Sequence, residues 1–204
     1  MPAGAAKRVR RRLPAVYGLG LAAVLWAGAC SQTFAQPLGS LGGSFELTDH
    51  NGQPFASTAL AGQPYAIFFG FTHCPDVCPT TLMEMSNGLQ SLGADADRLK
   101  VIFVTVDPER DTPDRLKQYL TAFDPRIVAL TGSSAQIAAA ARSWSAAYNK
   151  VPEDNGSYTI VHSAYVYLMD ADNRLSGTLG FQESEAEQLA KLKALLAKRG
   201  ASSK

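Results

Sequence analysis

The segment "YAIFFGFTHCPDVCPTTL", residues 65–82, constrains the fold more than any other part of this 204-residue chain. It opens with a continuous apolar run rich in aromatic residues, a pattern typical of a central strand covered on both faces. The run leads into a loop that holds Cys74 and Cys78, and then into a stretch with helical spacing. This order predicts an α/β domain with its chemistry at the end of a buried strand.

Strand and helix patterns alternate through the middle of the chain, and a hairpin and a helix close it. Strands are predicted at residues 44–49, 99–107, 126–132, 160–170 and 175–181, and helices at residues 79–93, 112–123, 133–148 and 183–200. Residues 149–159 are predicted to form a polar loop. Because the cysteine loop lies between a buried strand and a helix, we predict an α/β fold: a thioredoxin-like three-layer domain with a mixed central sheet and added β-hairpins.

The N-terminal segment has the pattern of an export signal. Five basic residues lie within the first twelve positions and precede an apolar run at residues 13–29. We therefore predict a signal peptide or N-terminal membrane anchor at residues 1–30 and a flexible linker at residues 31–43. The remainder, residues 44–204, is predicted to be the folded, thioredoxin-like domain.

Three fates of the N-terminal segment remain open. A peptidase could cut after residues 33–35, Cys30 could be lipidated, or the apolar run could remain as an uncleaved anchor. Each fate places the domain on the periplasmic side of a bacterial inner membrane, anchored, lipidated or secreted. The formal net charge of +1 gives no support for a nucleic-acid partner.

Cys74 and Cys78 are the only cysteines of the predicted domain. Their spacing favours a metal-binding or redox function over a structural disulfide. A disulfide across so short a loop would remove little entropy from the unfolded chain. Thioredoxin-type reductants separate their cysteines by two residues, whereas this chain separates them by three. On one helical face the two Cβ atoms would be about 5–6 Å apart, which suits a shared metal ion better than a relaxed disulfide. The interpretation of Cys74 and Cys78 as a redox pair also remains open.

A histidine is the most common partner for two thiolates at a metal site. His162 follows the polar loop and begins a predicted strand, and we predict it as the third ligand. His50 lies in a predicted turn and His73 adjoins Cys74 in an extended segment, so both are interpreted as structural. Two thiolates and one imidazole suit Cu(I) best, with Zn(II) as the competitor.

Other candidate residues carry less weight. Met83 and Met85 offer thioether sulfurs, but methionines on a helix are more often core residues. Asp76 lies between the two cysteines and either tunes their charge or forms the turn. The charged segment "VDPERDTP", residues 106–113, follows a buried strand on the edge where α/β folds place their sites, and it is open to a functional or a purely local role.

Four segments together resemble the Sco/SenC family of copper-binding proteins. They are "FFGFTHCPDVCPTTL" at residues 68–82, "VTVDPERDTP" at residues 104–113, "FDPRIVALTG" at residues 123–132 and "VHSAYVYLMD" at residues 161–170. The resemblance runs from about Phe45 to the last helix. It implies a thioredoxin-like fold and copper, as Cu(I) or Cu(II), bound by Cys74, Cys78 and His162. Val161 departs from the pattern, because many family members carry an acidic residue before the histidine.

The resemblance also implies a function in the assembly of cytochrome c oxidase. We expect a copper chaperone that delivers copper to, or matures, the binuclear copper site on the copper-bearing oxidase subunit, with other periplasmic copper chaperones open as further partners. The alternative is a thiol-disulfide oxidoreductase in which Cys74 and Cys78 are the redox pair. A peroxidase is disfavoured, because the prolines beside both cysteines do not suit a peroxide pocket.

Overall fold

The computed structural model describes residues 41–154, 156–181 and 183–198. The predicted signal peptide or anchor and most of the predicted linker lie outside the described residues, so those predictions stay untested. Residues 41–43 are described, and the Gly42 N–H donates a hydrogen bond to the Ser143 carbonyl oxygen at 3.2 Å. Within the described part of the chain, no helix combines the length and the apolar character needed to cross a membrane.

The described residues form nine β-strands and four α-helices. The strands are β1 (Glu46–Asp49), β2 (Pro54–Ala56), β3 (Tyr65–Gly70), β4 (Lys100–Thr105), β5 (Ile127–Thr131), β6 (Tyr148–Pro152), β7 (Tyr158–His162), β8 (Val166–Met169) and β9 (Leu175–Leu179). The helices are α1 (Val77–Leu92), α2 (Pro113–Leu120), α3 (Ser134–Ser143) and α4 (Glu185–Ala197), with short 3-10 helices at Ser57–Leu60 and Gly93–Arg98.

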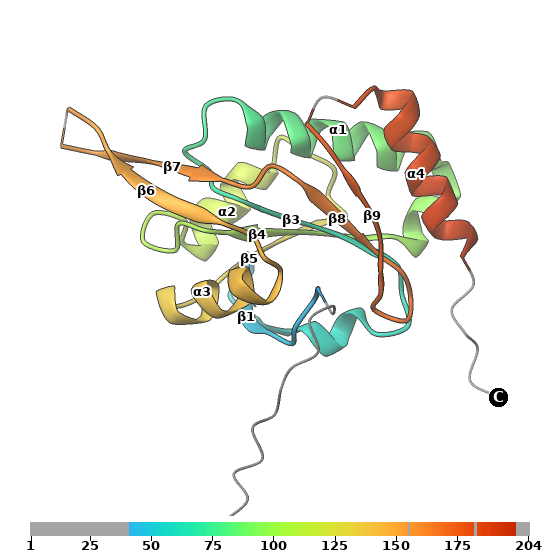
Figure 1. The fold of residues 1–204 in the computed structure, drawn as a ribbon, viewed down its shortest axis with the longest axis horizontal. Coiled ribbons are helices and arrows are strands. Elements are labelled where there is room, and N and C mark those ends of the chain that lie inside the picture. Colours follow the sequence, from blue (N-terminus) through green and yellow to red (C-terminus); the bar gives the residue numbers. More distant parts are fainter. Residues whose placement is uncertain (1–40, 155, 182, 199–204) are drawn as a thin grey trace, which may run out of the picture. The chain divides into compact units, whose positions relative to one another are not determined.

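Seven strands form one mixed sheet in the order β2-β1-β5-β4-β3-β8-β9 (Figure 1). The central strands β3, β4 and β5 run parallel, and β8 and β1 flank them antiparallel. Strands β6 and β7 pair only with each other within the described residues, and they extend from the main sheet as a separate hairpin. The mixed sheet and the added hairpins that the sequence predicts are confirmed.

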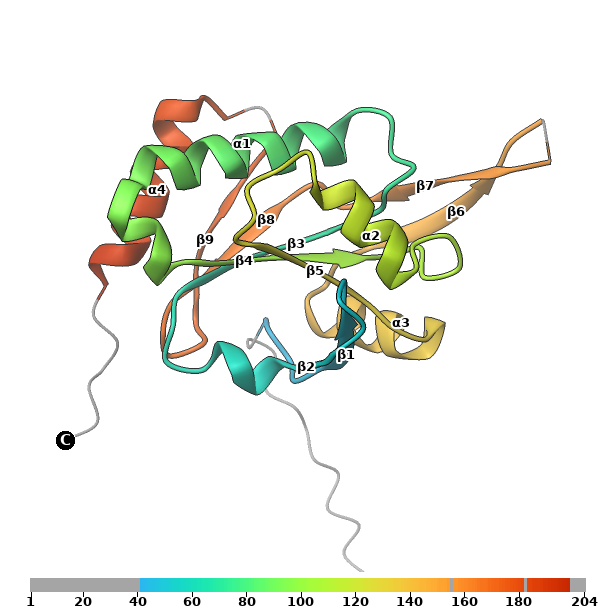
Figure 2. The ribbon, with the colours of Figure 1, turned by 180° about the vertical axis from the view of Figure 1, so that it is seen from behind.

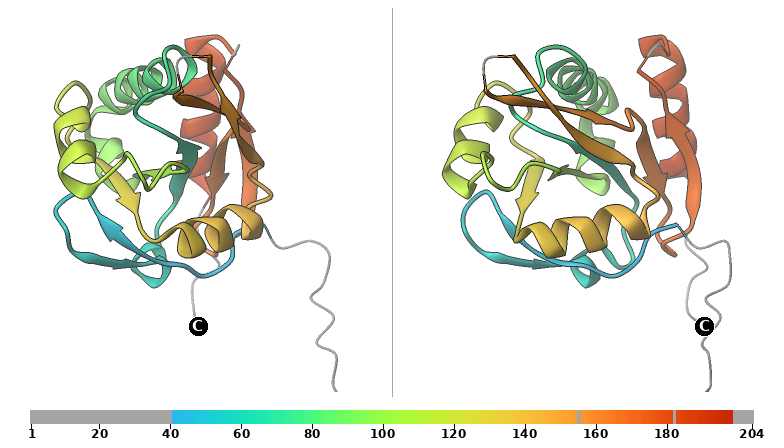
Figure 3. Two further views of the ribbon diagram at one scale, coloured as in Figure 1. Left: turned by 90° about the vertical axis from the view of Figure 1, so that its left-hand side faces the viewer. Right: turned by 60° about the vertical axis from the view of Figure 1, so that its left-hand side comes forward.

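The helices cover both faces of the sheet. Helices α1, α2 and α4 lie on one face and α3 lies on the other (Figures 2 and 3). The parallel crossovers from β3 to β4 and from β4 to β5 move in one direction across the sheet. Right-handed connections therefore place α1 and α2 on the same side. The three predicted layers are confirmed.

Aromatic side chains fill the core between the sheet and the helices. All six residues of β3 are buried, as its continuous apolar run predicts. The Phe103 ring is fully buried and lies between the Phe68 ring, at a centroid distance of 5.8 Å, and the Tyr119 ring, at 6.2 Å. The N-terminus of α2 begins as predicted, because Thr112 accepts a hydrogen bond from the Arg115 N–H and Pro113 occupies the first turn.

Two predictions about residues 149–170 are wrong. The predicted polar loop is instead the β6–β7 hairpin, whose register pairs Lys150 with Ile160 and Tyr148 with His162. The predicted single strand at residues 160–170 is divided between β7 and β8, which belong to different sheets. His162 therefore ends a strand and does not begin one.

Removing the Phe103 ring should weaken the whole domain. A Phe103→Ala substitution leaves a cavity between two aromatic rings at a site that cannot close around it, so we expect a loss of about 3–5 kcal/mol in the free energy of unfolding. Urea unfolding followed by circular dichroism measures this loss. A Phe55→Ala control, at a ring only partly buried against the core, should cost clearly less; equal losses would contradict the placement of Phe103.

Candidate metal centre

The cysteine loop joins the end of β3 to the start of α1. Helix α1 begins at Val77, so Cys78 is its second residue and Pro79 its third. A proline is tolerated there because the N–H groups of the first turn have no partner inside the helix. Cys74 lies in the loop before the helix, where Pro75 biases it away from helical backbone. As predicted, Cys74 precedes the helix and Cys78 lies in its first turn. The distance expected for two residues on one helical face therefore does not apply to this pair.

The sulfur of Cys74 nevertheless interacts with the N-terminus of α1. Asp76 occupies the N-cap position but makes no side-chain capping hydrogen bond. The Cys78 N–H instead donates a hydrogen bond to Cys74 Sγ at 3.4 Å. A free N–H at a helix N-terminus stabilises an anion, and here that anion is a thiolate.

Gly70 makes room for the second sulfur. It is the last residue of β3, and a Cβ atom at this position would lie 2.8 Å from Cys78 Sγ and 2.9 Å from Cε2 of Phe103. The absence of a side chain allows the backbone of the central strand to contact the cysteine directly. Cys78 is fully buried as a result.

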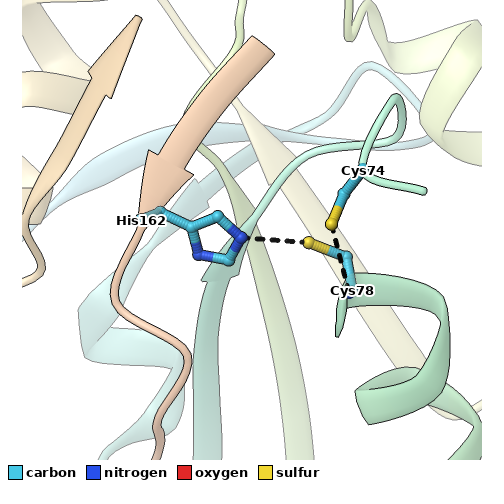
Figure 4. Close-up of side chains that lie close together, drawn as sticks. All are labelled: Cys74, Cys78 and His162. Carbon is cyan, nitrogen blue, oxygen red and sulfur yellow. Dashed lines mark hydrogen bonds between the residues drawn. The ribbon is translucent and has the colours of Figure 1, made fainter. Parts of the chain in front are cut away.

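His162 reaches the cysteines from the end of β7 (Figure 4). Its ring makes edge contacts with Phe71, at a centroid distance of 5.7 Å, and with Phe68, at 6.0 Å. Nδ1 lies 3.0 Å from the Ser163 carbonyl oxygen, and since a carbonyl only accepts, Nδ1 carries the proton. In the neutral ring Nε2 is then free to act as a ligand, and it lies 3.3 Å from Cys78 Sγ.

The three predicted ligand atoms converge. The sulfurs of Cys74 and Cys78 and a ring nitrogen of His162 lie within 4.8 Å of one another. Cys78 is fully buried, whereas Cys74 and His162 are half-buried, so the site is closed on one side and accessible on the other. Two thiolate sulfurs and one imidazole nitrogen form a donor set that suits a soft metal ion.

The two thiols differ in their affinity for a proton. The pKa of Cys74 is lowered to about 4, first because the Cys78 side chain hydrogen-bonds to it and then through the backbone N–H groups of Cys78 and Asp76, while burial acts in the opposite direction. The pKa of Cys78 is raised, first by that same hydrogen bond to Cys74 and then by burial. The opposite directions of the two shifts place the first ionisation of the pair at Cys74. Both cysteines are free of disulfide bonds.

Asp111 holds the cysteine loop in place from the segment that follows β4. It is fully buried and accepts hydrogen bonds from the Thr72 N–H at 2.9 Å, the Thr72 hydroxyl at 2.6 Å and the Thr105 hydroxyl at 2.6 Å. Its segment, residues 106–113, stands out in the sequence as a charged stretch, but the role of Asp111 does not. Two aspartates in a charged loop directly after a buried strand were the available signal.

The remaining candidates contribute no atom to the ligand cluster. His50 directly follows β1 in a turn, where its Nδ1 accepts a hydrogen bond from the Ala129 N–H, and His73 is exposed beside Thr72. The structural interpretation of both fits these contacts. Met85 lies in the core at 2% exposure, while Met83 is 47% exposed. Asp76 is the exposed N-cap of α1.

Comparison with known sequences identifies a family. The sequence model of the SCO1/SenC family matches residues 35–197. A SCO2-like protein of Rickettsia prowazekii is 42% identical over 136 residues, which cover 66% of each protein. The mitochondrial protein SCO2 of Saccharomyces cerevisiae is 38% identical over 159 residues, which cover 76% of this chain and 52% of the yeast protein. The match thus spans about half the length of that yeast relative.

A solved structure shares the fold. Bradyrhizobium japonicum ScoI, in a structure with copper bound, is similar with a TM-score of 0.71 and a sequence identity of 46%. The match covers 76% of this chain and 99% of the other. Together with the strand order described above, this similarity confirms the predicted thioredoxin-like fold.

The acidity of Cys74 should depend on Cys78. In the reduced, metal-free protein, alkylation of the peptide that contains Cys74 should follow an ionisation near pH 4. A Cys78→Ala substitution removes the largest cause of the lowered pKa and should move this midpoint upward. A His162→Ala substitution should move it less. Iodoacetamide labelling with mass spectrometry resolves Cys74 from Cys30; an unchanged midpoint in Cys78→Ala would refute the proposed hydrogen bond.

The same shift has a consequence for stability. Because the pKa of Cys74 is lower in the folded chain than in the unfolded chain, its thiolate contribution to stability is complete above the ordinary thiol range and is lost as the pH falls through about 4. Urea unfolding at several pH values measures this dependence, which Cys74→Ala should reduce.

Adding a methyl group at Gly70 should change the positions of the two sulfur atoms while the domain still folds. In Gly70→Ala the new Cβ must displace Cys78 Sγ or the Phe103 ring, and such overpacking costs about 1–3 kcal/mol. The spacing of the sulfur atoms should change as well, which a crystal structure of the variant would show. A Gly177→Ala control, where an added Cβ meets open space, should leave both stability and the thiols unchanged.

Proposed function

Because the chain belongs to the SCO1/SenC family, we propose that it is a copper chaperone that binds one copper ion through Cys74, Cys78 and His162. The ion is its cargo, which it delivers to the binuclear copper site of cytochrome c oxidase. The observation that carries this proposal is the convergence of three ligand atoms from a loop, a helix and a strand within 4.8 Å. The similarity to a structure of ScoI with copper bound supports it.

The donor set favours copper by its chemistry. Thiolate sulfur is soft and selects Cu(I), while imidazole accommodates copper and zinc alike. The hydrogen bond from Nδ1 to the Ser163 carbonyl oxygen orients the His162 ring and leaves Nε2 as the donor. Zn(II) is the competitor that this set does not exclude by ligand type alone.

The uneven burial of the three side chains supports transfer by ligand exchange. Cys74 and His162 are half-buried and open to an approaching partner, whereas Cys78 lies against Gly70 and Phe103 without exposure. We propose that Cys78 is the last ligand to release the ion. A ligand of the partner protein would first displace a donor on the accessible side.

We further propose that the domain acts on the periplasmic side of the inner membrane, attached through or released from its N-terminal segment. The basic and apolar pattern of residues 1–30 supports this location. The partner on that side is the copper-bearing subunit of cytochrome c oxidase, which family membership supports.

A second function is favoured by the thiol pair itself. A thiolate with a lowered pKa beside a second free thiol is the arrangement of a thiol-disulfide oxidoreductase. In this alternative the protein reduces a disulfide between the cysteines of the oxidase copper site, and Cys74 and Cys78 are oxidised to a disulfide in exchange. The reaction does not require His162. Thiol-disulfide exchange with an oxidised peptide of that site, measured for the wild type and His162→Ala, separates the two functions.

Copper binding should depend on all three ligands. In a Cys30→Ala background, which removes the third thiol of the chain, we expect one tightly bound copper ion per protein. Cys74→Ser, Cys78→Ser and His162→Ala should each weaken binding by more than about 100-fold, because even the loss of a residue that only orients a ligand costs about 10–100-fold. Competition with a Cu(I) chelator measures these affinities.

The neighbouring histidine provides the control. His73→Ala removes an exposed imidazole next to Cys74 and should leave copper affinity unchanged. Tight, stoichiometric binding that survives in all three ligand variants would overturn the site, and loss of binding in His73→Ala would show that the wrong histidine had been assigned.

A further inference from the structure

The charged loop between β4 and α2, residues 106–112, contacts both halves of the metal centre. Two of its carboxylates, Asp107 and Asp111, are fully buried. Burying a carboxylate is costly unless it is paired or hydrogen-bonded, so each is expected to have a specific partner. Their partners lie in different parts of the fold, and each partner precedes a ligand of the site.

Asp111 secures the cysteine half. Its carboxylate accepts both the backbone N–H and the hydroxyl of Thr72, which lies two residues before Cys74. The Thr105 hydroxyl at the end of β4 donates to the same carboxylate. The loop thereby holds the start of the cysteine loop against the central sheet.

Asp107 and Arg110 secure the histidine half. The Arg110 guanidinium pairs with the Asp107 carboxylate through Nε and donates from Nη1 to the Tyr158 carbonyl oxygen at 2.9 Å. The Tyr158 hydroxyl donates to the other oxygen of Asp107 at 2.7 Å. The guanidinium also lies 3.9 Å from the centre of the Tyr158 ring. We call this set of three residues, Asp107, Arg110 and Tyr158, the clamp.

The clamp and His162 occupy the two ends of one strand. Tyr158 is the first residue of β7 and His162 the last, and since side chains alternate along a strand, both project to the same face. Within the described residues β7 pairs only with β6, so no strand of the main sheet fixes its position. The clamp supplies a fixed point for the strand that carries the third ligand.

Arginine is suited to this task in a way that lysine is not. Its planar guanidinium donates to Asp107 and to the Tyr158 carbonyl oxygen at once while it stacks on the ring. Lys150 also lies 4.4 Å from the Tyr158 ring centre and pairs with Glu109 at 2.7 Å, but both of these charged groups are exposed. An exposed pair of this kind contributes little.

We propose that Asp107 and Arg110 are positioning residues for His162, and that Asp111 has the same role for the thiolates. One loop thus sets the distance between the two halves of the ligand set. The role assigned to the clamp rests on the proposed copper site. Without the clamp, the hairpin would keep its own hydrogen bonds but would no longer present Nε2 to the sulfurs.

Two variants break the clamp to different degrees. Arg110→Gln removes the charge and the ring contact, and we expect copper affinity to fall by about 10–100-fold, as for other residues that orient a ligand. Tyr158→Phe keeps the ring and removes one hydrogen bond, for a smaller loss of about 2–10-fold. Arg142→Gln, at an exposed arginine on α3, is the matched control and should bind like the wild type.

A double-mutant cycle distinguishes positioning from general damage. If Arg110 acts through His162, then Arg110→Gln should cause no further loss of copper affinity in the His162→Ala background. A loss of the same size in both backgrounds would overturn the proposal, as would wild-type affinity in Arg110→Gln.

A measurement on the metal-free protein keeps the clamp testable if copper binding itself fails. Amide hydrogen exchange of residues 158–162 should become faster in Arg110→Gln and Tyr158→Phe, and nuclear magnetic resonance should show a displaced His162 ring signal. If the wild type bound no copper, the proposed function would be wrong, but the hydrogen exchange and the His162 signal would still test whether the clamp holds β7. Unchanged exchange and an unchanged His162 signal in both variants would refute the clamp itself.

Discussion

The parallel pairing of β3 with β4 is the constraint on which the site depends. Its register places Gly70 opposite Thr105, so both strands end at the same edge of the sheet. The chain continues from Gly70 into the cysteine loop and from Thr105 into the charged loop, and the Val106 N–H still donates to the Gly70 carbonyl oxygen at 2.8 Å. A slip of one residue would reverse the faces of the side chains and move Asp111 away from Thr72.

The electrostatics of the ligand set follow from the same arrangement. The pKa of Cys74 is lowered by the hydrogen bond from the Cys78 side chain and by backbone N–H groups, while the pKa of Cys78 is raised by that same hydrogen bond and then by burial. A metal ion that binds both sulfurs must displace the proton of Cys78, so its apparent affinity depends on pH. The metal-free protein thus favours one thiolate and one thiol, whereas a metal ion bound to both sulfurs requires two thiolates.

Much of the fold was predictable from the sequence. The apolar run of β3 and the Thr112 cap of α2 are strong local patterns, and both predictions are confirmed. The β6–β7 hairpin was missed because β6 is largely exposed and shows no alternation of apolar residues. Asn149 and Val161, for example, pair across the hairpin and are both exposed, although Ile160 is buried. The position of Cys74 before the helix was predicted, but α1 begins at Val77, two residues before the predicted stretch, because spacing alone does not locate the first residue of a helix.

The candidate site was predictable in its ligands but not in its supports. Two cysteines and a late histidine are visible as residue types, and the structure brings them together. Asp107 and Arg110 look like solvated loop charges in the sequence. Their roles depend on Tyr158, which lies about fifty positions further along the chain, and burial of this kind is decided only by the tertiary fold.

The separation of His162 from the main sheet has a thermodynamic consequence. The thiols lie on the cysteine loop and α1, whereas the imidazole lies on a hairpin that pairs with no strand of the main sheet within the described residues. A local opening of the hairpin would therefore leave the strand pairing of that sheet intact. An ion held by all three residues would stabilise the closed hairpin, and closure of the hairpin would strengthen binding of the ion. The two free-energy changes must be equal. Measuring how tightly the ion binds and measuring how often the hairpin opens would therefore report the same coupling free energy.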